Sequence, residues 1–463
     1  MSLSTGVNVA YLFAAVCFIL ALKGLTSPKT ARYGNGLGAF GMVVAVVMTF
    51  VNRHVENLDL IVIALACGVV VGIPAARMVK MTAMPQMVAA FNGVGGGAAA
   101  LVDIADFSKH THVGVAEWVQ VAVVFGVIVG CISFSGSIIA FLKLQEVMTG
   151  TPITYKGQQA VNALVGVAIL ALGGMVLATT SSPDLAIMAG VALLFGVAFV
   201  LPIGGADMPV VISLLNSFTG LAVAASGFVL NNVLLIVAGT LVGASGTLLT
   251  RMMSQAMGRS LANVLFGAFG KVQVSSTGTG TGGGEDRPVR SASAQDIGTM
   301  LAYAQKVIIV PGYGLAVAQA QHTVKELADA LTSKGVEIDY AIHPVAGRMP
   351  GHMNVLLAEA DVPYDQLKEM DEINPEFPST DVALVVGAND VVNPAARDMQ
   401  GSPIYGMPIL DVDRAHQVVF LKRSMRPGFA GIDNELFYDP KVTLLFGDAK
   451  DSLSKLVSAV KSA

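Results

Sequence analysis

Three short stretches late in the chain carry residue types that bind phosphates and sugars. The first, "VIIVPGYGLAVAQA" over 307–320, runs from a β-branched segment into a turn that contains Gly312 and Gly314. A glycine turn between a strand and a helix lets backbone N–H groups and a helix N-terminus approach a pyrophosphate. The G-x-G-x-x-G fingerprint is incomplete, because Val317 stands at its third glycine. The alternative is a tight turn that needs glycine only for its backbone angles.

The other two stretches also follow β-branched runs. "VVFLKRS" ends in Lys422, Arg423 and Ser424, and two cations with a hydroxyl suit the extra phosphate of NADP. A solvated surface is the alternative for this cluster. "VVGANDVVNP" contains Asn389 and Asp390, which can hydrogen-bond a ribose or a carboxamide, with an Asx turn as the equal alternative.

The end of the second expected strand distinguishes the two nicotinamide nucleotides. An NAD site usually has an acidic residue there, which holds the ribose 2′-hydroxyl. This chain has "AIHPVAGR" instead, with His343 and Arg348 and no carboxylate. The sequence therefore favours NADP over NAD.

The elements that would position these residues alternate between strands and helices. Short β-branched runs occur at "KVIIV", "VEIDYAIH", "VALVVG", "QVVFLK" and "VTLLFG", and helical patterns cover about 315–333, 351–360 and 451–462. This alternation predicts a soluble, Rossmann-like α/β domain over 296–463, in which a parallel sheet has helices on both faces. The stretch 272–295, rich in Gly, Ser and Thr, predicts a flexible linker before it.

The first part of the chain has a different composition. The whole chain is 54% hydrophobic and 13% charged with a mean hydropathy of +0.66, and only 18 of its 60 charged residues lie before residue 256. This imbalance predicts a membrane domain over 1–254, a polytopic helical bundle embedded in the lipid bilayer. We expect nine spans, or eight if the glycine-rich fourth fails, at 6–25, 34–52, 57–79, 84–106, 117–141, 160–180, 184–203, 208–226 and 229–252.

Charges between the spans support the odd number and give an orientation. The odd loops and the region after the last span hold Lys23, Lys29, Arg32, Arg77, Lys80, Lys143, Lys156, Arg251, Arg259 and Lys271. The even loops are expected to hold Arg53, Lys109, Glu56, Asp59, Asp103, Asp106 and Asp184. The positive-inside rule then places the N-terminus outside and the C-terminal half in the cytoplasm.

Polar residues within spans are candidates for a proton pathway, because lipid makes them costly. Asn92, Ser137, Asp207 and Asn216 are the four candidates. Asp207 is equally well interpreted as a helix N-cap, and the other three as hydrogen-bonding groups between or within helices. Small residues four apart, as at Gly126 and Gly130 or Gly239 and Gly243, predict close helix packing.

Several classes of site and partner are not expected. Cys17, Cys67 and Cys131 lie in apolar runs without Cys or His at metal-ligand spacing, so neither a disulfide nor a metal site is predicted. With a net charge of −4 and no basic face, the chain gives no indication of nucleic-acid binding.

These motifs together resemble a known family, the beta subunit of proton-translocating NAD(P) transhydrogenase. "GGADMPVV", "GYGLAVAQAQ", "HPVAGRMPGHMNVLLAEA", "MDEIN", "GANDVVNPAA", "KRSM" and "FGDAK" occur in the family's order across essentially the whole chain. The resemblance implies a multi-pass protein of the bacterial inner membrane with a cytoplasmic domain that binds NADP(H). It also implies an alpha-subunit partner that binds NAD(H) and adds a membrane segment, and a dimer of the whole complex.

The resemblance assigns roles by position. It implies pyrophosphate contact by the loop from Gly312 to Val317, 2′-phosphate contact by Lys422, Arg423 and Ser424, and nicotinamide-side, catalytic roles for Asn389 and Asp390. His343 and Arg348 are implied in a neighbouring functional loop. The full set of expected cofactor contacts is Gly312, Tyr313, Gly314, Leu315, Ala316, Val317, Gly347, Arg348, Gly387, Ala388, Asn389, Asp390, Lys422, Arg423, Ser424, Gly428, Phe429, Ala430, Gly431, Gly447, Asp448 and Ala449. NADP is implied to lie reversed relative to ordinary Rossmann enzymes.

Two positions depart from the family pattern. Asn92 stands where several relatives have a mid-membrane histidine, so the proton-handling group is expected from a partner's helix. "GFAGIDN" has Phe429 where the family's lid segment usually has tyrosine, which keeps an apolar cover and loses a hydroxyl.

The expected mechanism couples hydride transfer to proton movement through a change of conformation. Hydride transfer between two nicotinamides needs no protein acid or base, so the protein's task is to position the rings and exclude water. The alternatives are an ion transporter or channel with a nucleotide-sensing domain, and a membrane dehydrogenase with a small-molecule substrate. A filter-like "TVGYG" motif is missing from the sequence, and about 170 soluble residues leave little room for a substrate domain.

Overall fold

The computed structural model describes most of the chain. The described residues are 3–51, 57–79, 83–110, 116–145, 147–149, 152–204, 207–256, 260–262, 289–347, 351–399, 402, 404–426, 428 and 431–463. The chain divides into two compact units, Met1–Arg251 and Met252–Ala463, and the boundary falls inside the ninth long helix. The predicted linker over 272–295 lies largely outside the described residues.

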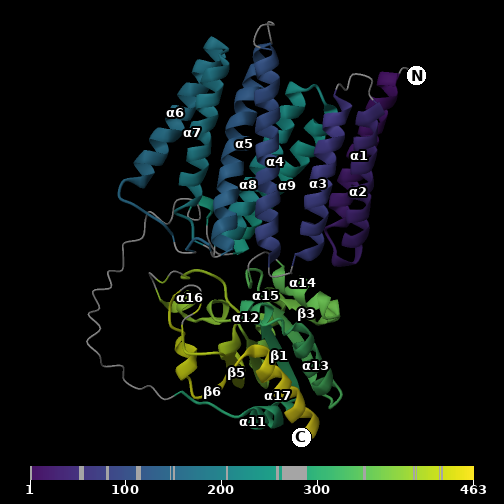
Figure 1. Cartoon of the computed structure of the whole chain (residues 1–463). Helices are drawn as coiled ribbons and strands as arrows, with labels where there is room; N and C mark the ends of the chain where they lie inside the picture. Colours follow the sequence, from purple (N-terminus) through teal and green to yellow (C-terminus); the bar gives the residue numbers. More distant parts are fainter. Residues whose placement is uncertain are drawn as a thin grey trace. The chain divides into compact units, whose positions relative to one another are not determined.

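The elements of the first unit are all helices among its described residues. Nine of its helices are long and apolar enough to cross a membrane, which confirms the expected odd number (Figure 1). They are α1 (Leu3–Gly24), α2 (Pro28–Val51), α3 (Leu58–Met78), α4 (Met84–His110), α5 (Glu117–Leu144), α6 (Gln158–Thr179), α7 (Ser182–Val200), α8 (Met208–Val229) and α9 (Val233–Ala256). The chain is therefore a multi-pass membrane protein.

Several helices begin or end at other residues than expected, such as α2, which begins at Pro28 and not at 34, and one of these differences changes the interpretation of an acidic residue. The fourth helix continues to His110, four residues beyond the expected end, so Asp103 and Asp106, which we counted among the loop charges, lie well within α4. The ninth helix begins at Val233 because the Asn232 side chain accepts hydrogen bonds from the N–H groups of Leu234 and Leu235 at 3.0 and 3.3 Å. Hydropathy alone does not show where this helix begins, and the asparagine cap fixes its first residue.

Helix α5 is the centre of the first unit, and it packs against α4, α7 and α8. Glycines let the backbones approach: a Cβ at Gly130 of α5 would lie 2.7 Å from the carbonyl oxygen of Gly96 on α4. A Cβ at Gly239 of α9 would lie 2.4 Å from the backbone nitrogen of Ala224 on α8. The close packing predicted from small residues four apart is confirmed at both pairs.

The second unit contains a six-stranded parallel sheet. Its strands are β1 (Lys306–Pro311), β2 (Glu337–Ile342), β3 (Leu367–Glu369), β4 (Val382–Val386), β5 (Gln417–Lys422) and β6 (Val442–Phe446), in the order β3-β2-β1-β4-β5-β6. Every pair of neighbours is parallel, as in the register that joins Val307 to Val382 and Ile309 to Leu384. This order is that of a Rossmann-like fold.

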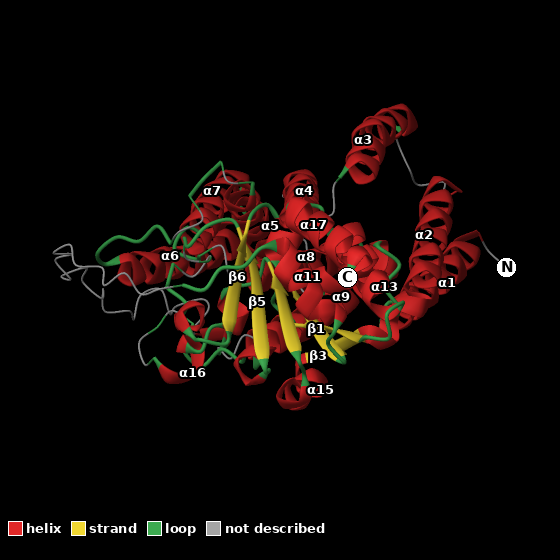
Figure 2. Ribbon diagram, turned by 90° about the horizontal axis from the view of Figure 1, so that it is seen from below, coloured by secondary structure: helices red, strands yellow, loops and turns green. Residues whose placement is uncertain are grey.

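Alternate residues of each strand enter two separate hydrophobic cores. In β1, Val307 and Ile309 belong to one core, while Ile308 and Val310 belong to the other. The first core is covered by α11 (Ala294–Ala302), α13 (Gln321–Thr332), α14 (His352–Glu359) and α17 (Ala449–Ser462). Figure 2 shows α11, α13 and α17 on one side of the strands and α15 (Met370–Ile373) on the other. Burial on both faces explains why the strands are continuous apolar runs and not alternating patterns.

The second face is covered by short helical elements, whereas we expected helices on both faces. Besides α15 it has the 3-10 turns Asn374–Ser379, Asp390–Val392, Val412–Arg414 and Glu435–Tyr438. The expected continuous helix over 315–333 was also wrong. It is divided into α12 (Tyr313–Val317) and α13, and Gln319 between them has a left-handed φ of 49°.

Candidate functional site

The strand order reverses its direction between β1 and β4, which are neighbours in the sheet. The chain leaves β1 towards β2 and leaves β4 towards β5, so the loops after these two strands diverge. Ligands of open α/β sheets bind in the crevice outside the carboxyl ends of the strands at such a point. The candidate residues of the soluble unit therefore belong to this edge, because they follow β1, β2, β4, β5 and β6.

Three glycines let the loops after β1 and β4 touch through their backbones. The N–H groups of Gly312 and Gly314 donate to the carbonyls of Val386 and Gly387, both at 2.9 Å. A Cβ at Gly312 would lie 2.4 Å from the oxygen of Gly387, and one at Gly314 would lie 2.6 Å from its Cα. Gly387 has a φ of 69°, which L side chains rarely adopt. Gly312 and Gly314 are therefore needed for the close approach of the two loops and not for a positive φ, whereas Gly387 is needed for both. The approach of a pyrophosphate to this turn stays a prediction.

The helix after the first loop is only one turn long. Tyr313 and Gly314 are half-buried, whereas Leu315 and Ala316 are fully buried in the core. The N–H of Ala320 donates to the carbonyl of Leu315 at 3.2 Å, which closes the turn before α13 begins. A phosphate here would consequently be bound by loop N–H groups rather than by the end of a long helix.

Asn389 and Asp390 lie at the exit of β4 and bond to each other. The Nδ2 of Asn389 donates to Oδ1 of Asp390 at 2.9 Å, while its buried Oδ1 has no hydrogen-bond partner among the described residues. Gly428 lies against both side chains, since a Cβ there would be 2.3 Å from Oδ1 of Asp390 and 2.5 Å from Nδ2 of Asn389. The buried Asn434 donates to the Asn389 carbonyl at 3.4 Å and so joins the two loops. Phe429 and Ala430 are outside the described residues, and Gly431 is exposed.

Lys422 ends β5 at the same edge of the sheet. Its ammonium lies 3.8 Å from the centre of the Phe437 ring, and it is buried without a hydrogen-bond partner within the described part of the chain. Burial lowers the pKa of Lys422 to about 8, and the nearby carboxylates of Asp390 and Asp433 oppose this shift. Arg423 and Ser424 follow it and are exposed. A buried cation without donors engaged is the arrangement that an anionic ligand would complete.

His343, at the exit of β2, is fully engaged within the protein. Its Nε2 lies 2.8 Å from the carbonyl oxygen of Pro408, and its Nδ1 accepts from the N–H of Val345 at 3.2 Å. These partners require the neutral tautomer with a proton on Nε2. Burial lowers the pKa of His343 to about 4, although the bond to Pro408 opposes the shift. Through these two bonds, the buried and neutral imidazole of His343 joins the loop after β2 to the segment that contains Pro408.

The remaining candidates follow β2 and β6. A Cβ at Gly347 would lie 2.3 Å from Nδ1 of the fully buried His352. Arg348 lies outside the described residues. After β6, the N–H of Gly447 donates to the Lys422 carbonyl at 3.0 Å, and the Asp448 side chain caps α17 by accepting from the N–H of Lys450 at 2.9 Å. Ala388 is half-buried and Ala449 is buried. Because the described candidates follow the carboxyl ends of parallel strands, they all lie at the same edge of the sheet.

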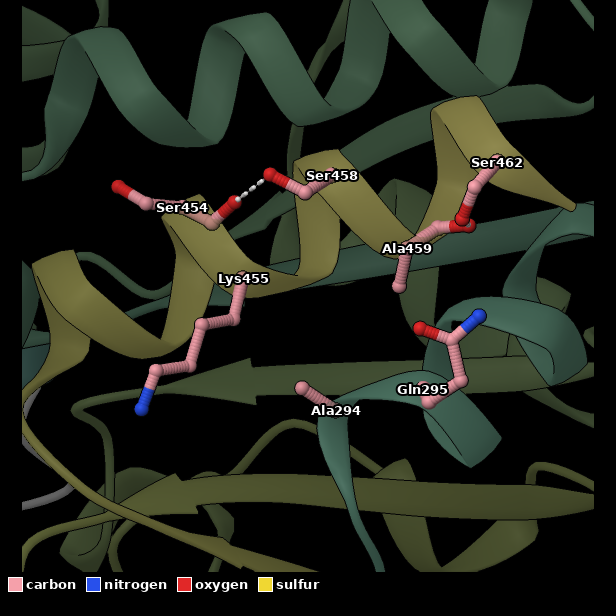
Figure 3. Close-up of a pocket in the computed structure, with 7 residues that line it drawn as sticks. All are labelled: Ala294, Gln295, Ser454, Lys455, Ser458, Ala459 and Ser462. Atoms are coloured by element: carbon pink, nitrogen blue, oxygen red, sulfur yellow. Dashed lines mark hydrogen bonds between the residues drawn. The ribbon is translucent and has the colours of Figure 1, made fainter.

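A hollow between α11 and α17 is a different feature. It is lined by Ala294, Gln295, Ser454, Lys455, Ser458, Ala459 and Ser462 (Figure 3). Ser458 donates to the Ser454 carbonyl within α17 at 3.0 Å. The hollow contains none of the candidate residues.

In the first unit, two of the four candidate polar residues meet. Nδ2 of Asn92 on α4 donates to Ser137 on α5 at 2.9 Å and lies 3.3 Å from Oγ of Ser133. Ser133 also lies 2.6 Å from the hydroxyl of Thr219 on α8 and donates to the Leu215 carbonyl at 2.8 Å. We call Asn92, Ser133, Ser137 and Thr219 the polar cluster. It joins the three helices through hydrogen bonds.

Asp207 and Asn216 lie elsewhere on α8. Asp207 is at the N-cap position, yet its side chain makes no capping hydrogen bond to this helix. Asn216 is half-buried, in the third turn. Ser133 and Thr219 were missed by the sequence analysis, although each is three or four residues from a candidate, at the spacing that shares a helix face.

The fold and the residues at the carboxyl edge of the sheet define a class of protein. It is a multi-pass membrane protein with a Rossmann-like domain of nucleotide-binding topology. The comparisons with known proteins are more specific. A sequence model of the NAD(P) transhydrogenase beta subunit matches residues 7–459. Two curated relatives from Rhodospirillum rubrum, each named NAD(P) transhydrogenase subunit beta, are 49% identical over 459 residues, which is 97% of this chain and 98% of each relative.

The chain belongs to the NAD(P) transhydrogenase beta subunit family. It is therefore an oxidoreductase subunit that works with NAD(P)-type nucleotides and with an alpha-subunit partner in a membrane. The family resemblance described from the sequence motifs is confirmed.

Proposed function

We propose that this chain binds NADP(H) at the carboxyl edge of its sheet and exchanges a hydride with NAD(H) bound to the alpha subunit. The observation that carries the assignment is the buried ammonium of Lys422, which lacks a hydrogen-bond partner in the described part of the chain. NADP differs from NAD by one phosphate, and a phosphate supplies the charge and the acceptor oxygens that this ammonium needs. Arg423 and Ser424 beside it are exposed and available to the same group.

The other candidate residues would hold the remainder of the nucleotide. Backbone N–H groups of the loop from Gly312 to Val317, other than those that Gly312 and Gly314 donate at the end of β4, would contact the pyrophosphate. The unpartnered Oδ1 of Asn389 would accept from the nicotinamide side, with Asp390 fixing the orientation of the amide through the bond at 2.9 Å. His343 and Arg348 belong to the adjoining loop, where His343 acts as a neutral positioning group.

The protein's contribution to the reaction is to position the nucleotide and exclude water. NADP(H), when bound, supplies the nicotinamide that accepts or donates the hydride. No side chain of this chain has to transfer a proton to the reacting carbon, so the residues after β1, β4 and β5 act through binding and orientation. Holding two reacting groups at about 3 to 3.5 Å accounts for a large share of such catalysis. The segment around Gly428, which packs against Asn389 and Asp390, would cover the site on one side.

Proton movement across the membrane would be coupled to this binding. We infer that the polar cluster and Asp207 and Asn216 lie along the proton's route, and that proton passage shifts the soluble unit between states that hold and release NADP(H). A membrane potential of about 100 mV supplies about 2.3 kcal/mol per charge, which matches the roughly 1 to 3 kcal/mol of typical allosteric coupling. The usual outcome would be formation of NADPH.

The setting that best fits this proposal is the bacterial inner membrane. The distribution of cations between the spans favours an external N-terminus and a cytoplasmic soluble domain. The alpha subunit would bring an additional membrane segment, and the complete complex would form a dimer.

Two experiments test the proposal at different levels. Purified residues 289–463 should bind NADP at least tenfold more tightly than NAD by calorimetry, and equal affinities would contradict the site assignment. Sealed vesicles containing this chain and its alpha subunit should form NADPH from NADH faster when a proton gradient is imposed. If an uncoupler leaves that rate unchanged, the coupling proposal fails and a nucleotide-sensing role becomes the better account.

A further inference from the structure

Asp103 is an acidic residue in the interior of a membrane-spanning helix. It lies seven residues before the end of α4, inside the candidate span Met84–Lys109, and its side chain is 0% exposed. Neither carboxylate oxygen has a hydrogen-bond partner among the described residues. Ionisable residues within membrane spans are costly and commonly mark a path for ions or protons. Asp103 is distinct from the four polar residues that the sequence analysis singled out.

The carboxylate of Asp103 lies between α5 and α8, against small residues. A Cβ at Gly126 of α5 would lie 2.0 Å from Oδ2 of Asp103 and 3.4 Å from the Cβ of Ala225 on α8. The hydroxyl of Ser226 is beside Asp103, but it donates its hydrogen to the Ala222 carbonyl at 3.1 Å. Gly126 thus provides the space for the carboxylate, and the hydroxyl of Ser226, shared with the Ala222 carbonyl, is the donor beside it.

The helices packed around Asp103 supply no described cation to balance it. On α4 itself, Asp106 is one turn away and half-buried, and the helix ends with Lys109, which is exposed, and His110. Within α8 there is no titratable residue, and α7 has only Asp184, whose carboxylate accepts from Thr179 at 2.7 Å.

The titratable groups of α5 are Glu117, Cys131 and Lys143. Glu117 is exposed at the first turn of the helix. Lys143 is at the opposite end, where its ammonium donates to the carbonyl of Ile203 at 2.8 Å. A buried carboxylate with no cation beside it and one shared hydroxyl as its donor is more stable as the neutral acid, because a poorly compensated charge in such surroundings costs several kcal/mol. Its charge state must therefore change when a cation or further donors reach it.

Asp103 shares a helix face with the polar cluster. Asn92, Gly96, Ala99 and Asp103 are spaced by three or four residues along α4 and are all buried. Eleven residues separate Asn92 from Asp103, which corresponds to about 16 Å along a helix axis. Between them, Gly96 approaches Gly130 of α5 so closely that a Cβ at Gly130 would lie 2.7 Å from the Gly96 oxygen. The acid and the cluster are thus placed in sequence along a single contact between α4 and α5.

We propose that Asp103 is a proton-binding residue of the membrane unit, which takes up a proton as a carboxylic acid and releases it towards the polar cluster or back to its own side of the membrane. The inference rests on the proposed coupling of proton movement to hydride transfer. It supplies a titrating group from this chain itself, in a bundle whose Asn92 cannot ionise. The step adds one proton to a carboxylate oxygen and removes it again, with no other bond changed.

The test uses the complete complex with its alpha subunit, reconstituted in liposomes. Proton uptake during hydride transfer would be followed with a pH-sensitive dye for the wild type and for Asp103→Asn, Asp103→Glu and Asp106→Asn. Asp103→Asn should reduce proton uptake at least tenfold while leaving NADP affinity unchanged. Asp103→Glu should retain uptake with a displaced pH profile. Asp106→Asn, a half-buried acid one turn away, should match the wild type.

The outcomes separate this inference from the proposed function. If the wild-type complex takes up no protons, the proposed function fails. If it does, and Asp103→Asn keeps the wild-type rate and pH profile, the role of Asp103 is overturned. Infrared spectroscopy keeps the test decisive should Asp103→Asn fail to assemble. The wild type should show the C=O stretch of a protonated carboxylic acid that moves in Asp103→Glu, and a spectrum independent of residue 103 would refute the proposal.

Discussion

The ammonium of Lys422 lies 3.8 Å above the ring of Phe437 and is buried without a hydrogen-bond partner among the residues that the structure describes. A cation–π contact contributes about 0.5 to 2 kcal/mol, which is less than full hydration of an ammonium. The strand end therefore holds a cation whose hydrogen-bonding capacity is unused. This is why we assign the 2′-phosphate of NADP to this position.

Replacing Lys422 with methionine should remove the preference for NADP. Methionine keeps the apolar stem against Phe437, while a hydrogen bond between charged groups worth about 1.5 to 3 kcal/mol is lost. We expect NADP affinity to fall about 10- to 100-fold, with NAD affinity unchanged, when both are measured by calorimetry on residues 289–463. Lys455→Met, which removes an exposed lysine from α17, is the matched control. A parallel loss of both nucleotides would show that Lys422 supports the fold and not the phosphate.

The affinity for NADP should also depend on pH in the alkaline range. Burial lowers the pKa of Lys422 to about 8, so in the free protein half of the ammonium groups have lost their proton at that pH and most of them have above it. A bound phosphate favours the charged form, and binding must then take up a proton. The affinity should therefore decrease as pH rises above 8, by up to about tenfold per pH unit. Lys422→Arg, which stays charged, should show a flat profile, and a flat wild-type profile would contradict the assignment.

The contact between Gly314 and Gly387 predicts that the two loops do not tolerate a side chain. Asparagine accepts the left-handed backbone of Gly387, yet its Cβ would lie 2.5 Å from the Cα of Gly314. We expect Gly387→Asn to lower the free energy of unfolding of residues 289–463 by about 1 to 3 kcal/mol. Nucleotide binding should also be lost.

Gly335→Asn provides the matched control for this substitution. Gly335 is also left-handed, with a φ of 89°, but no atom lies within 4 Å of a Cβ built there. It should keep both stability and binding, as measured by urea unfolding and calorimetry. Equal effects at the two positions would mean that backbone conformation, and not crowding between the loops, explains the need for glycine.

His343 predicts how the stability of the soluble unit changes in acid. Its folded pKa of about 4 lies below the ordinary value of 6.5, so between these values the unfolded chain binds more protons. The free energy of unfolding should therefore decrease as pH falls from 6.5 towards 4, by about 3 kcal/mol from this residue. His343→Gln should remove that part of the slope in urea titrations. His416→Gln, at an exposed histidine, should keep it. Superimposable slopes for the wild type and His343→Gln would exclude this explanation.

Much of the architecture could be predicted because lipid and parallel sheets impose simple patterns. Each of the nine long apolar runs corresponds to a helix, and the five β-branched runs are strands, since residues such as Val307 to Val310 are buried on both faces. The elements that were missed lack such patterns. Strand β3 has three residues and pairs only at Leu367–Glu369, and the break at Gln319 contains neither glycine nor proline.

The candidate sites were predictable as far as they follow strand ends. Asn389 and Lys422 were found because each directly follows an apolar run. Contacts between residues that are distant in the sequence could not be predicted. No local pattern indicates that Gly428 lies against Asp390, or that His343 bonds to Pro408, sixty-five residues later. Asp103 was counted among the loop charges, although the expected fourth span contained it, because three acidic or basic residues within seven positions are typical of a loop. Only the packing against Gly126 reveals that one of them is buried.

That packing gives a final prediction for proton transport. A methyl group at position 126 would lie 2.0 Å from Oδ2 of Asp103, so Gly126→Ala must displace the carboxylate or separate α4 from α5. We expect it to reduce proton uptake by the reconstituted complex at least tenfold. Gly190→Ala on α7, where no atom lies within 4 Å of the added Cβ, should have no effect.

A double-mutant comparison separates the two ways in which Gly126→Ala could act. If the methyl group acts by moving Asp103, it should have little further effect in the Asp103→Asn protein, because the two changes remove the same function. If it acts by loosening the contact between α4 and α5, the reductions should multiply. Proton uptake measured for the wild type, both single variants and the double variant distinguishes these cases. If the two reductions multiply, Gly126 acts only in helix packing, and its contact with Asp103 no longer supports the proposed site.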